Sequence, residues 1–467
     1  MVADTCAPCR KLPPTSGDLP LRKMAEEDGR NSRSSGDSDM EEEDNGGKPE
    51  EPAPRVYLPG QPLAEGEELV REESVYRLYH RAQSGAPCLS FDIVRDELGE
   101  ERTEFPMTIY LCAGTQALTA QANRLLVMKM HNLRGRKESD RDSGSESESS
   151  DSEDEEEESK CSPRLELAMV PHYGAINRVR VSEVQGCPLA ALWSEKGQVE
   201  VWDLRPQLEA VSDPRAMQVF LQERQNQLQP LFAFAGHMAE GFAVDWSPTM
   251  PGRLATGDCK KNIHVWEPGE GGTWKVDQRP YTAHTRSVED IQWSPNEPTV
   301  FASCSADASI RIWDTRAGPA RACMLSTEGA HDADVNVISW NRREPFLASG
   351  GDDGLLKVWD LRQFRDGASL ARFKLHSAPI TTVEWCPAES SVLAAAGADD
   401  LLTQWDLAVE RDVDREETPD LDQLPPQLLF IHQGQQDIKE LHWHPQCTGL
   451  MLSTALSGFD VFRTISV

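Results

Sequence analysis

Two groups of His, Ser, Asp and Trp side chains have the composition of a hydrogen-bonded, chemically active cluster. Their members are His284, Ser303, Asp307 and Trp313 in one group, and His331, Ser349, Asp353 and Trp359 in the other. A serine, a histidine and an aspartate that meet in space can form a nucleophilic triad. Since the arrangement recurs along the chain, the alternative is a structural tetrad in which buried polar groups satisfy one another.

Two further copies of the arrangement decide between these roles. Ala395 stands where a serine is expected before Trp405. Lys260 stands where an aspartate is expected before Trp266. A catalyst that is repeated and then lost in some copies is implausible, so we interpret the groups as structural tetrads. The sequence also lacks a Gly-rich phosphate loop, an HExxH motif and a GxSxG elbow. We therefore predict no enzymatic activity, no cofactor and no metal site.

The spacing of the same residues indicates what positions them. Histidines recur 47, 47 and 45 residues apart, and a tryptophan follows each by 28 or 29 residues. The pairs are His237 and Trp266, His284 and Trp313, His331 and Trp359, and His376 and Trp405. A short alternating strand precedes each tryptophan, as in Ser309–Trp313. A period of roughly 40–45 residues with Gly-His and Trp-Asp marks is the signature of the WD repeat, which forms a four-stranded propeller blade.

Weaker copies complete a ring. Asn177–Asp203 is interpreted as an earlier repeat, Ile438–Phe462 as a late one, and 106–170 as another that an acidic insert interrupts. We therefore predict an all-β fold, a seven-bladed WD-repeat β-propeller. The strand Met107–Cys112 is expected to complete the last blade, against Leu441–Phe462, and to close the ring. Closure removes exposed sheet edges, which otherwise promote aggregation.

The segments before the ring differ in composition. Residues 1–54 are rich in Ser, Gly, Pro and charge, which predicts a disordered acidic tail. Region 55–104 is expected to hold a lead-in and an N-terminal helix over 72–83, and the propeller is expected to occupy 105–467. The helix is predicted because apolar residues recur at helical spacing, at Val75, Leu78, Tyr79 and Ala82.

Charge is the strongest compositional feature. The chain has 78 acidic and 47 basic residues, a formal net charge of −31 and a pI of about 4.7. Such a surface repels nucleic acids and anionic membranes and attracts basic proteins. The acidic residues concentrate in a predicted disordered insert at about 134–163 and in a loop at about 408–426. The densest run of the insert is Glu153, Asp154, Glu155, Glu156, Glu157 and Glu158. The insert serves either cation capture or solubility.

Serines in this insert have the pattern of phosphorylation sites. Ser145, Ser150 and Ser152 each precede an acidic residue by three positions, which acidophilic kinases of the casein kinase type prefer. A phosphate adds roughly −1.5 to −2 charges at pH 7 and would strengthen the attraction of cations.

Cysteine usage and hydropathy indicate the compartment. The eleven cysteines are scattered, which predicts reduced thiols. Cys6 and Cys9 form a CxxC pair, but a zinc site needs a second pair. No apolar run is long enough for a membrane helix or a signal peptide. We expect a cytosolic or nuclear monomer.

Three stretches resemble the propeller family of retinoblastoma-binding histone-chaperone subunits. Ser74–His80 resembles the helix that precedes their ring, and Phe105–Ile109 is an altered version of their Trp-Pro-Ser-Leu-Thr turn into the closing strand. Glu416–Pro426 followed by Leu428–His432 is similar to their acidic loop, which ends in Pro-Pro before a strand. This last match is the most specific. The position of the acidic insert points to the glutamate-rich branch of the family.

The resemblance implies a function that composition alone does not give. It implies a nuclear and nucleolar scaffold that binds core histones and acts in chromatin and ribosome assembly, with a ribosomal protein of the large subunit as a second partner. The residues support a mechanism independently. A polyanion competes with nucleic acid for the Lys and Arg residues of such partners, through contacts that salt weakens.

A groove between helix 72–83 and loop 416–426 is the predicted binding site. An apolar wall with an acidic rim suits a basic amphipathic helix. Leu78 and Tyr79 are the apolar candidates, and the cation-facing candidates are Glu416, Glu417, Asp420 and Asp422. The alternative is that Leu78 and Tyr79 only anchor the helix to the propeller flank.

A function of another class also fits the sequence. Trp202–Arg205, Trp313–Arg316 and Trp359–Arg362 match the WDxR pattern of substrate receptors that dock onto the adaptor of cullin-type ubiquitin ligases. Arg316 and Arg362 would make that contact. The pattern overlaps the ordinary end of a blade strand, so its specificity is low.

Overall fold

The computed structural model describes residues 70–135, 162–224, 227–410 and 424–467, all within the unit Val70–Val467. Several predictions from the sequence fall outside these ranges. They concern the tail 1–54 with Cys6 and Cys9, the run 153–158, the serines Ser145, Ser150 and Ser152, and the loop residues Glu416, Glu417, Asp420 and Asp422. None of the described helices combines the length and the apolar character that a membrane crossing requires.

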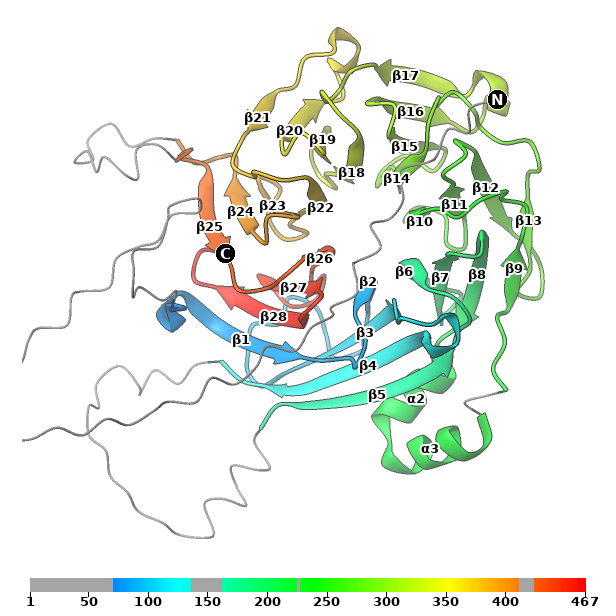
Figure 1. Ribbon diagram of the computed structural model, residues 1–467, viewed down its shortest axis with the longest axis vertical. Coiled ribbons are helices and arrows are strands. Elements are labelled where there is room, and N and C mark those ends of the chain that lie inside the picture. Colours follow the sequence, from blue (N-terminus) through cyan, green and yellow to red (C-terminus); the bar gives the residue numbers. More distant parts are fainter. Residues whose placement is uncertain (1–69, 136–161, 225–226, 411–423) are drawn as a thin grey trace, which may run out of the picture. The chain divides into compact units, whose positions relative to one another are not determined.

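Seven four-stranded antiparallel sheets surround a central axis as the blades of a β-propeller, which confirms the predicted fold class and blade number (Figure 1). The first blade contains β2 (Cys88–Val94), β3 (Met107–Thr115), β4 (Arg124–Leu133) and β5 (Arg164–Pro171). The second contains β6 (Ile176–Val184), β7 (Cys187–Ser194), β8 (Gln198–Asp203) and β9 (Phe232–Phe234). The third contains β10 (Ala243–Trp246), β11 (Leu254–Gly257), β12 (Ile263–Pro268) and β13 (Trp274–Val276). The fourth contains β14 (Val288–Trp293), β15 (Val300–Ser305), β16 (Ile310–Asp314) and β17 (Cys323–Thr327).

The remaining blades follow the same order, from the innermost strand to the outermost. The fifth contains β18 (Val335–Trp340), β19 (Phe346–Gly351), β20 (Leu356–Asp360) and β21 (Ala371–Phe373). The sixth contains β22 (Ile380–Trp385), β23 (Val392–Gly397), β24 (Leu402–Asp406) and β25 (Leu428–His432). The seventh contains β26 (Glu440–Trp443), β27 (Leu450–Ala455), β28 (Gly458–Thr464) and β1 (Tyr76–Ala82).

Helical segments are short. They are η1 (Glu73–Val75), η2 (Ala120–Ala122), α2 (Arg205–Ser212), α3 (Pro214–Val219), the π-helical η4 (Phe220–Arg224), η5 (Pro319–Arg321) and η6 (Phe364–Asp366). Figure 1 shows α2 and α3 beside β5, and Val211 and Phe220 pack with apolar residues of the first two blades. The middle strands are buried on both faces, since neighbouring blades pack against each other; every residue of Val392–Gly397 is buried.

The strand that closes the ring is β1, so the prediction of Met107–Cys112 for this role was wrong. β1 pairs antiparallel with β28, with Tyr76 opposite Thr464 and Ala82 opposite Phe459. Met107–Thr115 instead forms β3 and pairs with both β2 and β4 of the first blade. The propeller therefore begins at Tyr76 and not at residue 105, because β1 and β2 both lie within the expected lead-in.

The predicted helix over 72–83, and the likeness of Ser74–His80 to a family helix, were wrong for the same reason. Only Glu73–Val75 forms a helical turn, of the 3-10 type. From Tyr76 burial alternates, with Tyr76 and Leu78 buried and Arg77 exposed, as expected for a strand. The free edge of β28 offers hydrogen bonds to an extended chain, and this tertiary pairing overrides a short apolar pattern that also fits a helix.

The two groups of His, Ser, Asp and Trp residues form hydrogen-bonded tetrads in the fourth and fifth blades. His284 Nδ1 lies 3.1 Å from Asp307 Oδ2, its Nε2 lies 2.7 Å from Ser303 Oγ, and Trp313 Nε1 donates to the same Oγ at 2.8 Å. The corresponding atoms of His331, Ser349, Asp353 and Trp359 are 2.7–3.1 Å apart. The polar side chains of these groups therefore satisfy one another inside their blades.

Two copies that looked degraded in the sequence are also complete, through residues at other positions. In the third blade Asp258, and not position 260, accepts from His237 at 2.9 Å, and Thr256 bridges the histidine and Trp266. In the sixth blade Thr403, on the neighbouring strand β24, replaces the serine missing at Ala395. It lies 3.1 Å from His376 Nε2 and accepts from Trp405 at 2.8 Å.

Candidate protein-binding flank

The outer strands β1 and β25 lie on adjacent blades and form one flank of the propeller. Tyr76 joins them: its ring centroid lies 5.5 Å from that of Phe430, and its hydroxyl lies 2.7 Å from His432 Nδ1. The Pro425-Pro426 segment directly precedes β25. The structure thus places the two stretches that the sequence assigned to a groove on the same flank, although the N-terminal one is a strand.

Leu78 and Tyr79 anchor β1 and do not form an apolar binding wall. Leu78 is only 2% exposed and packs with Phe459 and Val461 in the core between the seventh and first blades. Tyr79 is half-buried, and its hydroxyl donates to Asp460 at 2.6 Å. Burial, and then this hydrogen bond, raise the pKa of Tyr79 to about 12, so the phenol keeps its proton at neutral pH. The alternative interpretation of these residues therefore fits the structure better.

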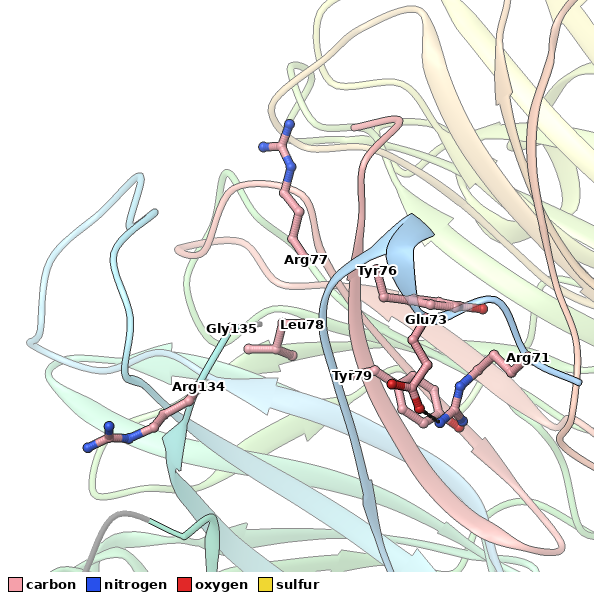
Figure 2. Close-up of a pocket in the computed structure, with 8 residues that line it drawn as sticks. All are labelled: Arg71, Glu73, Tyr76, Arg77, Leu78, Tyr79, Arg134 and Gly135. Atoms are coloured by element: carbon pink, nitrogen blue, oxygen red, sulfur yellow. Dashed lines mark hydrogen bonds and ion pairs between the residues drawn. The ribbon is translucent and has the colours of Figure 1, made fainter. Parts of the chain in front are cut away.

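A pocket of about 200 Å³ opens beside β1 (Figure 2). Its lining consists of Arg71, Glu73, Tyr76, Arg77, Leu78, Tyr79, Arg134 and Gly135. The Arg71 guanidinium lies 3.9 Å above the centre of the Tyr79 ring and 3.5 Å from Glu73. With three arginines and one glutamate, the lining is basic. The expected acidic rim depended on residues 416–422, which lie outside the described ranges.

The acidic insert begins next to this pocket. β4 ends at Leu133 and β5 begins at Arg164, and His131 pairs with Arg164 across the two strands. The insert therefore leaves and returns at the same end of the first blade. On the leaving side, the imidazole Nε2 of His80 on β1 lies 3.0 Å from the carbonyl oxygen of Arg134, which ties this chain to the flank.

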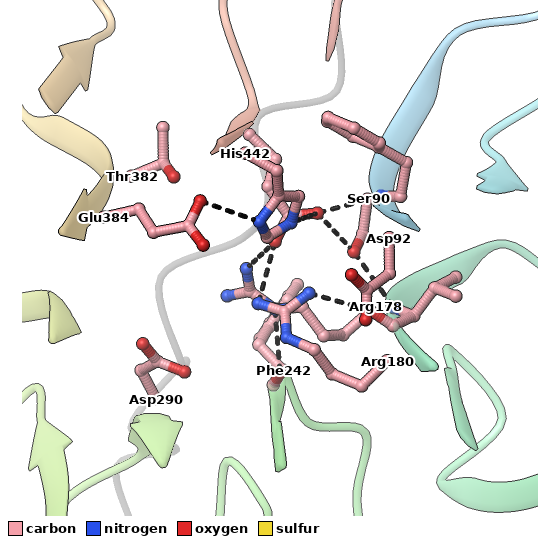
Figure 3. Close-up of polar contacts among 12 residues, drawn as sticks. Ser90, Asp92, Arg178, Arg180, Phe242, Asp290, Thr382, Glu384 and His442 are labelled. Atoms are coloured by element: carbon pink, nitrogen blue, oxygen red, sulfur yellow. Dashed lines mark hydrogen bonds and ion pairs between the residues drawn. The ribbon is translucent and has the colours of Figure 1, made fainter. Parts of the chain in front are cut away.

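A second polar centre lies on the propeller axis, where charged residues of the inner strands meet (Figure 3). Glu440 on β26 is 1% exposed. One carboxylate oxygen accepts from Arg178 at 2.7 Å and is 2.9 Å from Arg180, both on β6. The other accepts from Ser90 at 2.6 Å and from the backbone N–H of Phe91 at 2.8 Å. Glu440 thus ties the last blade to the first and second.

Burial and pairing oppose each other in the ionisation of this centre. Burial alone would raise the pKa of Glu440, but the guanidiniums of Arg180 and Arg178 hold it well below its usual value. Burial alone would lower the pKa of His442, but Glu384 and Glu440 raise it to about 10. At neutral pH the centre is therefore a network of full charges.

Similar side-chain acceptors link successive inner strands around the axis. They take the backbone N–H of the next blade in the pairs Asp92 and Val181, Asp245 and Trp293, Asp290 and Ile338, and Glu384 and Trp443, at 2.6–3.1 Å. The composition of the inner strands could have revealed this centre, since NRVRV and ELHW place charges among buried apolar residues. Sequence reasoning passed over these charges because it treated them as surface residues.

The arginines of the WDxR pattern are exposed but already paired. Arg362 Nη2 lies 2.7 Å from Asp360, and Arg316 contacts Asp314 in the same way; their side chains are 67% and 73% exposed. Arg279 pairs likewise with Asp277 at 2.9 Å in a turn that lacks the pattern. The pairing reflects an aspartate two residues before an arginine, so it gives no reason to favour ligase docking.

Comparisons with known proteins agree with this geometry. The family of the histone-binding protein RBBP4, a component of the CAF1 complex, matches residues 66–134, which include β1 to β4 and the pocket. The family "WD domain, G-beta repeat" matches 276–314 and 323–360.

Three relatives cover most of the chain. Glutamate-rich WD repeat-containing protein 1 of Dictyostelium discoideum is 43% identical over 86% of this chain and 83% of its own length. Protein HEAT STRESS TOLERANT DWD 1 of Arabidopsis thaliana is 42% identical over 88% and 92%. Ribosome assembly protein rrb1 of Schizosaccharomyces pombe is 40% identical over 91% and 88%.

Proposed function

Because the chain belongs to the family of glutamate-rich WD repeat-containing proteins, we propose that it is a histone-binding, chaperone-type scaffold. It shields core histones and a ribosomal protein of the large subunit during chromatin and ribosome assembly. The observation that carries the proposal is the coincidence of two features on one flank. The histone-binding family match spans β1 to β4, and the acidic insert leaves the propeller at the end of β4.

The mechanism follows from charge. Between residues 138 and 158 the chain has twelve carboxylates and one arginine. A polyanion of this kind presents many acceptors to Lys and Arg side chains and competes with nucleic acid phosphates for them. Such exposed ion pairs are individually weak and are screened by salt, so affinity arises from their number. The rigid propeller supplies the point of attachment.

The test removes the charge and keeps the length. In one variant every Asp and Glu of 138–158 is replaced by Ser or Gly, and binding of purified core histones is titrated at several salt concentrations. We expect weaker binding and a shallower dependence on salt, with an unchanged melting temperature because the insert lies outside the blades. The matched control neutralises Glu270 and Glu297, which are exposed on other blades. Unchanged affinity and salt dependence in the insert variant would reduce the insert to a role in solubility.

We also propose that the protein acts in the nucleus and the nucleolus, as its proposed partners require. A fluorescent fusion of the full chain tests this. Accumulation in the nucleolus is expected, and exclusion from the nucleus would contradict the proposal.

A further inference from the structure

The pocket beside β1 has the opposite charge to the rest of the molecule. Its lining contains Arg71, Arg77 and Arg134 and a single carboxylate, Glu73, in a chain whose formal net charge is −31. Glu73 pairs with Arg71. Within the part of the chain that the structure describes, Arg77 and Arg134 are exposed and have no carboxylate partner. Unpaired cations that gather on a strongly acidic protein indicate an anionic occupant.

Surrounding contacts hold these arginines in place. The Tyr79 ring supports Arg71 from below at 3.9 Å, a distance typical of a cation–π contact. Burial, and then the neighbouring charge of Arg77, lower the pKa of the Arg463 guanidinium, which lies beneath β1. A second buried cation therefore reinforces the positive potential at this site.

The backbone after β4 is fitted closely to the same place. Gly135 packs against the Phe105 ring, and a Cβ atom at this position would also come within 2.9 Å of the Arg77 carbonyl oxygen. Only a residue without a side chain allows this approach. Together with the contact between His80 and Arg134, it directs the acidic insert out of the propeller at the edge of the pocket.

We propose that this pocket, here called the arginine pocket (Arg71, Arg77 and Arg134), binds the acidic insert 138–158 of the same chain. Charge complementarity supports this occupant, since the insert carries a net charge of −11, from twelve carboxylates and one arginine. The place where the described chain ends supports it too. Only two residues separate Gly135 from Glu138, and three residues span at most about 10 Å. Tethering at this distance gives a high effective concentration.

The inference rests on the proposed function and refines it. An insert held by the arginine pocket has part of its charge neutralised, so basic cargo must displace it before binding along its full length. The pocket thus lowers the affinity for weakly basic proteins while strongly basic ones still bind. A ligand that binds only the released state has its apparent affinity reduced by the fraction released.

The first experiment measures the contact directly. A fluorescein-labelled peptide of residues 138–158 is titrated with a chain from which 138–158 has been removed, and its anisotropy is recorded at low and at physiological salt. Arg77→Glu with Arg134→Glu should weaken peptide binding by about five- to tenfold, from two exposed ion pairs. The matched control, Arg279→Glu with Arg316→Glu, makes the same change in net charge on other blades and should leave binding within about twofold. Equal weakening by both double variants would overturn the proposal, because the attraction would then be non-specific.

The second experiment tests occupancy within one chain. In the full-length protein Arg77→Glu with Arg134→Glu should release the insert, so core histones should bind more tightly, whereas the control variant should behave like the wild type. Histone binding unchanged by the pocket variant would overturn the proposal that the insert of the same chain is the occupant. Peptide binding without this gain would then point to the tail 1–54 or a second copy, which deletion of 1–54 and sedimentation at several concentrations would identify.

Controls separate the possible failures. Arg77→Gln with Arg134→Gln repeats both measurements if the Glu variant has a lowered melting temperature. If histones fail to bind the full-length wild type while the peptide still binds the pocket, the proposed function is wrong and the contact remains. If histones bind and the peptide does not, the contact is wrong and the function stands.

Discussion

The axis and the flank of this propeller both gather arginines, but they use them in opposite ways. At the axis Arg178 and Arg180 share one carboxylate, that of the buried Glu440. On the flank Arg77 and Arg134 are exposed and lack such a partner among the described residues. A buried cation without its counter-charge costs several kcal/mol, whereas an exposed one costs almost nothing. The axis charges therefore serve the ring, and the flank charges are free to bind.

Removing the shared carboxylate of the axis should have the largest effect. Glu440→Ala leaves two buried guanidiniums without a counter-charge and deprives Ser90 and Phe91 of their acceptor. We expect the free energy of unfolding to fall by about 3–5 kcal/mol, measured by urea denaturation. The flank counterpart, Glu73→Ala, removes a carboxylate that is 70% exposed and should change stability by less than about 0.5 kcal/mol. Similar losses in the two variants would contradict the distinction between axis and flank.

Truncation of the closing strand should rank next. Leu78→Ala removes a buried side chain between the seventh and first blades and should cost about 2–5 kcal/mol. Leu118→Ala, at a fully exposed leucine, is the matched control and should be nearly neutral. Histone affinity measured well below the melting temperature should be unchanged in both variants, because Leu78 supports the ring and does not contact cargo. A selective loss of affinity would restore Leu78 as a binding residue.

The same contrast explains how much of the molecule could be predicted from the sequence. Blade number followed from the phased His and Trp residues, because each tetrad is local to one blade. The closing strand did not, since Tyr76–Ala82 pairs with residues nearly 400 positions away, and its pattern also fits a helix. The tetrads of the third and sixth blades were misjudged because Asp258 and Thr403 supply the same atoms from other backbone positions. The arginine pocket combines residues from two distant segments, which no spacing rule connects.

The charge state of the axis gives a smaller, pH-dependent effect. The folded pKa of His442 is raised from 6.5 to about 10, so the folded state binds this proton more tightly than the unfolded state. Its stabilising contribution is fully present below pH 6.5 and is lost as the pH rises through about 10. Wild-type urea midpoints should therefore fall between pH 7 and 10 by more than those of His442→Gln. Parallel midpoints for the two proteins would show that His442 is not protonated at neutral pH.

The smallest effect is expected where exposed arginines are already paired. Arg316→Ala with Arg362→Ala leaves Asp314 and Asp360 without their partners. The change adds two net negative charges to a chain that already carries −31. Both side chains lie away from the flank, so histone affinity should stay within about twofold of the wild type, and any shift should be towards tighter binding of basic cargo. Binding of a purified cullin-ligase adaptor, measured with the same proteins, separates the two functions. Adaptor binding that is abolished in this variant, together with unchanged histone affinity, would establish a ligase role on a second surface. A loss of histone affinity would instead place the cargo on the blade ends and contradict a binding site on the β1 flank.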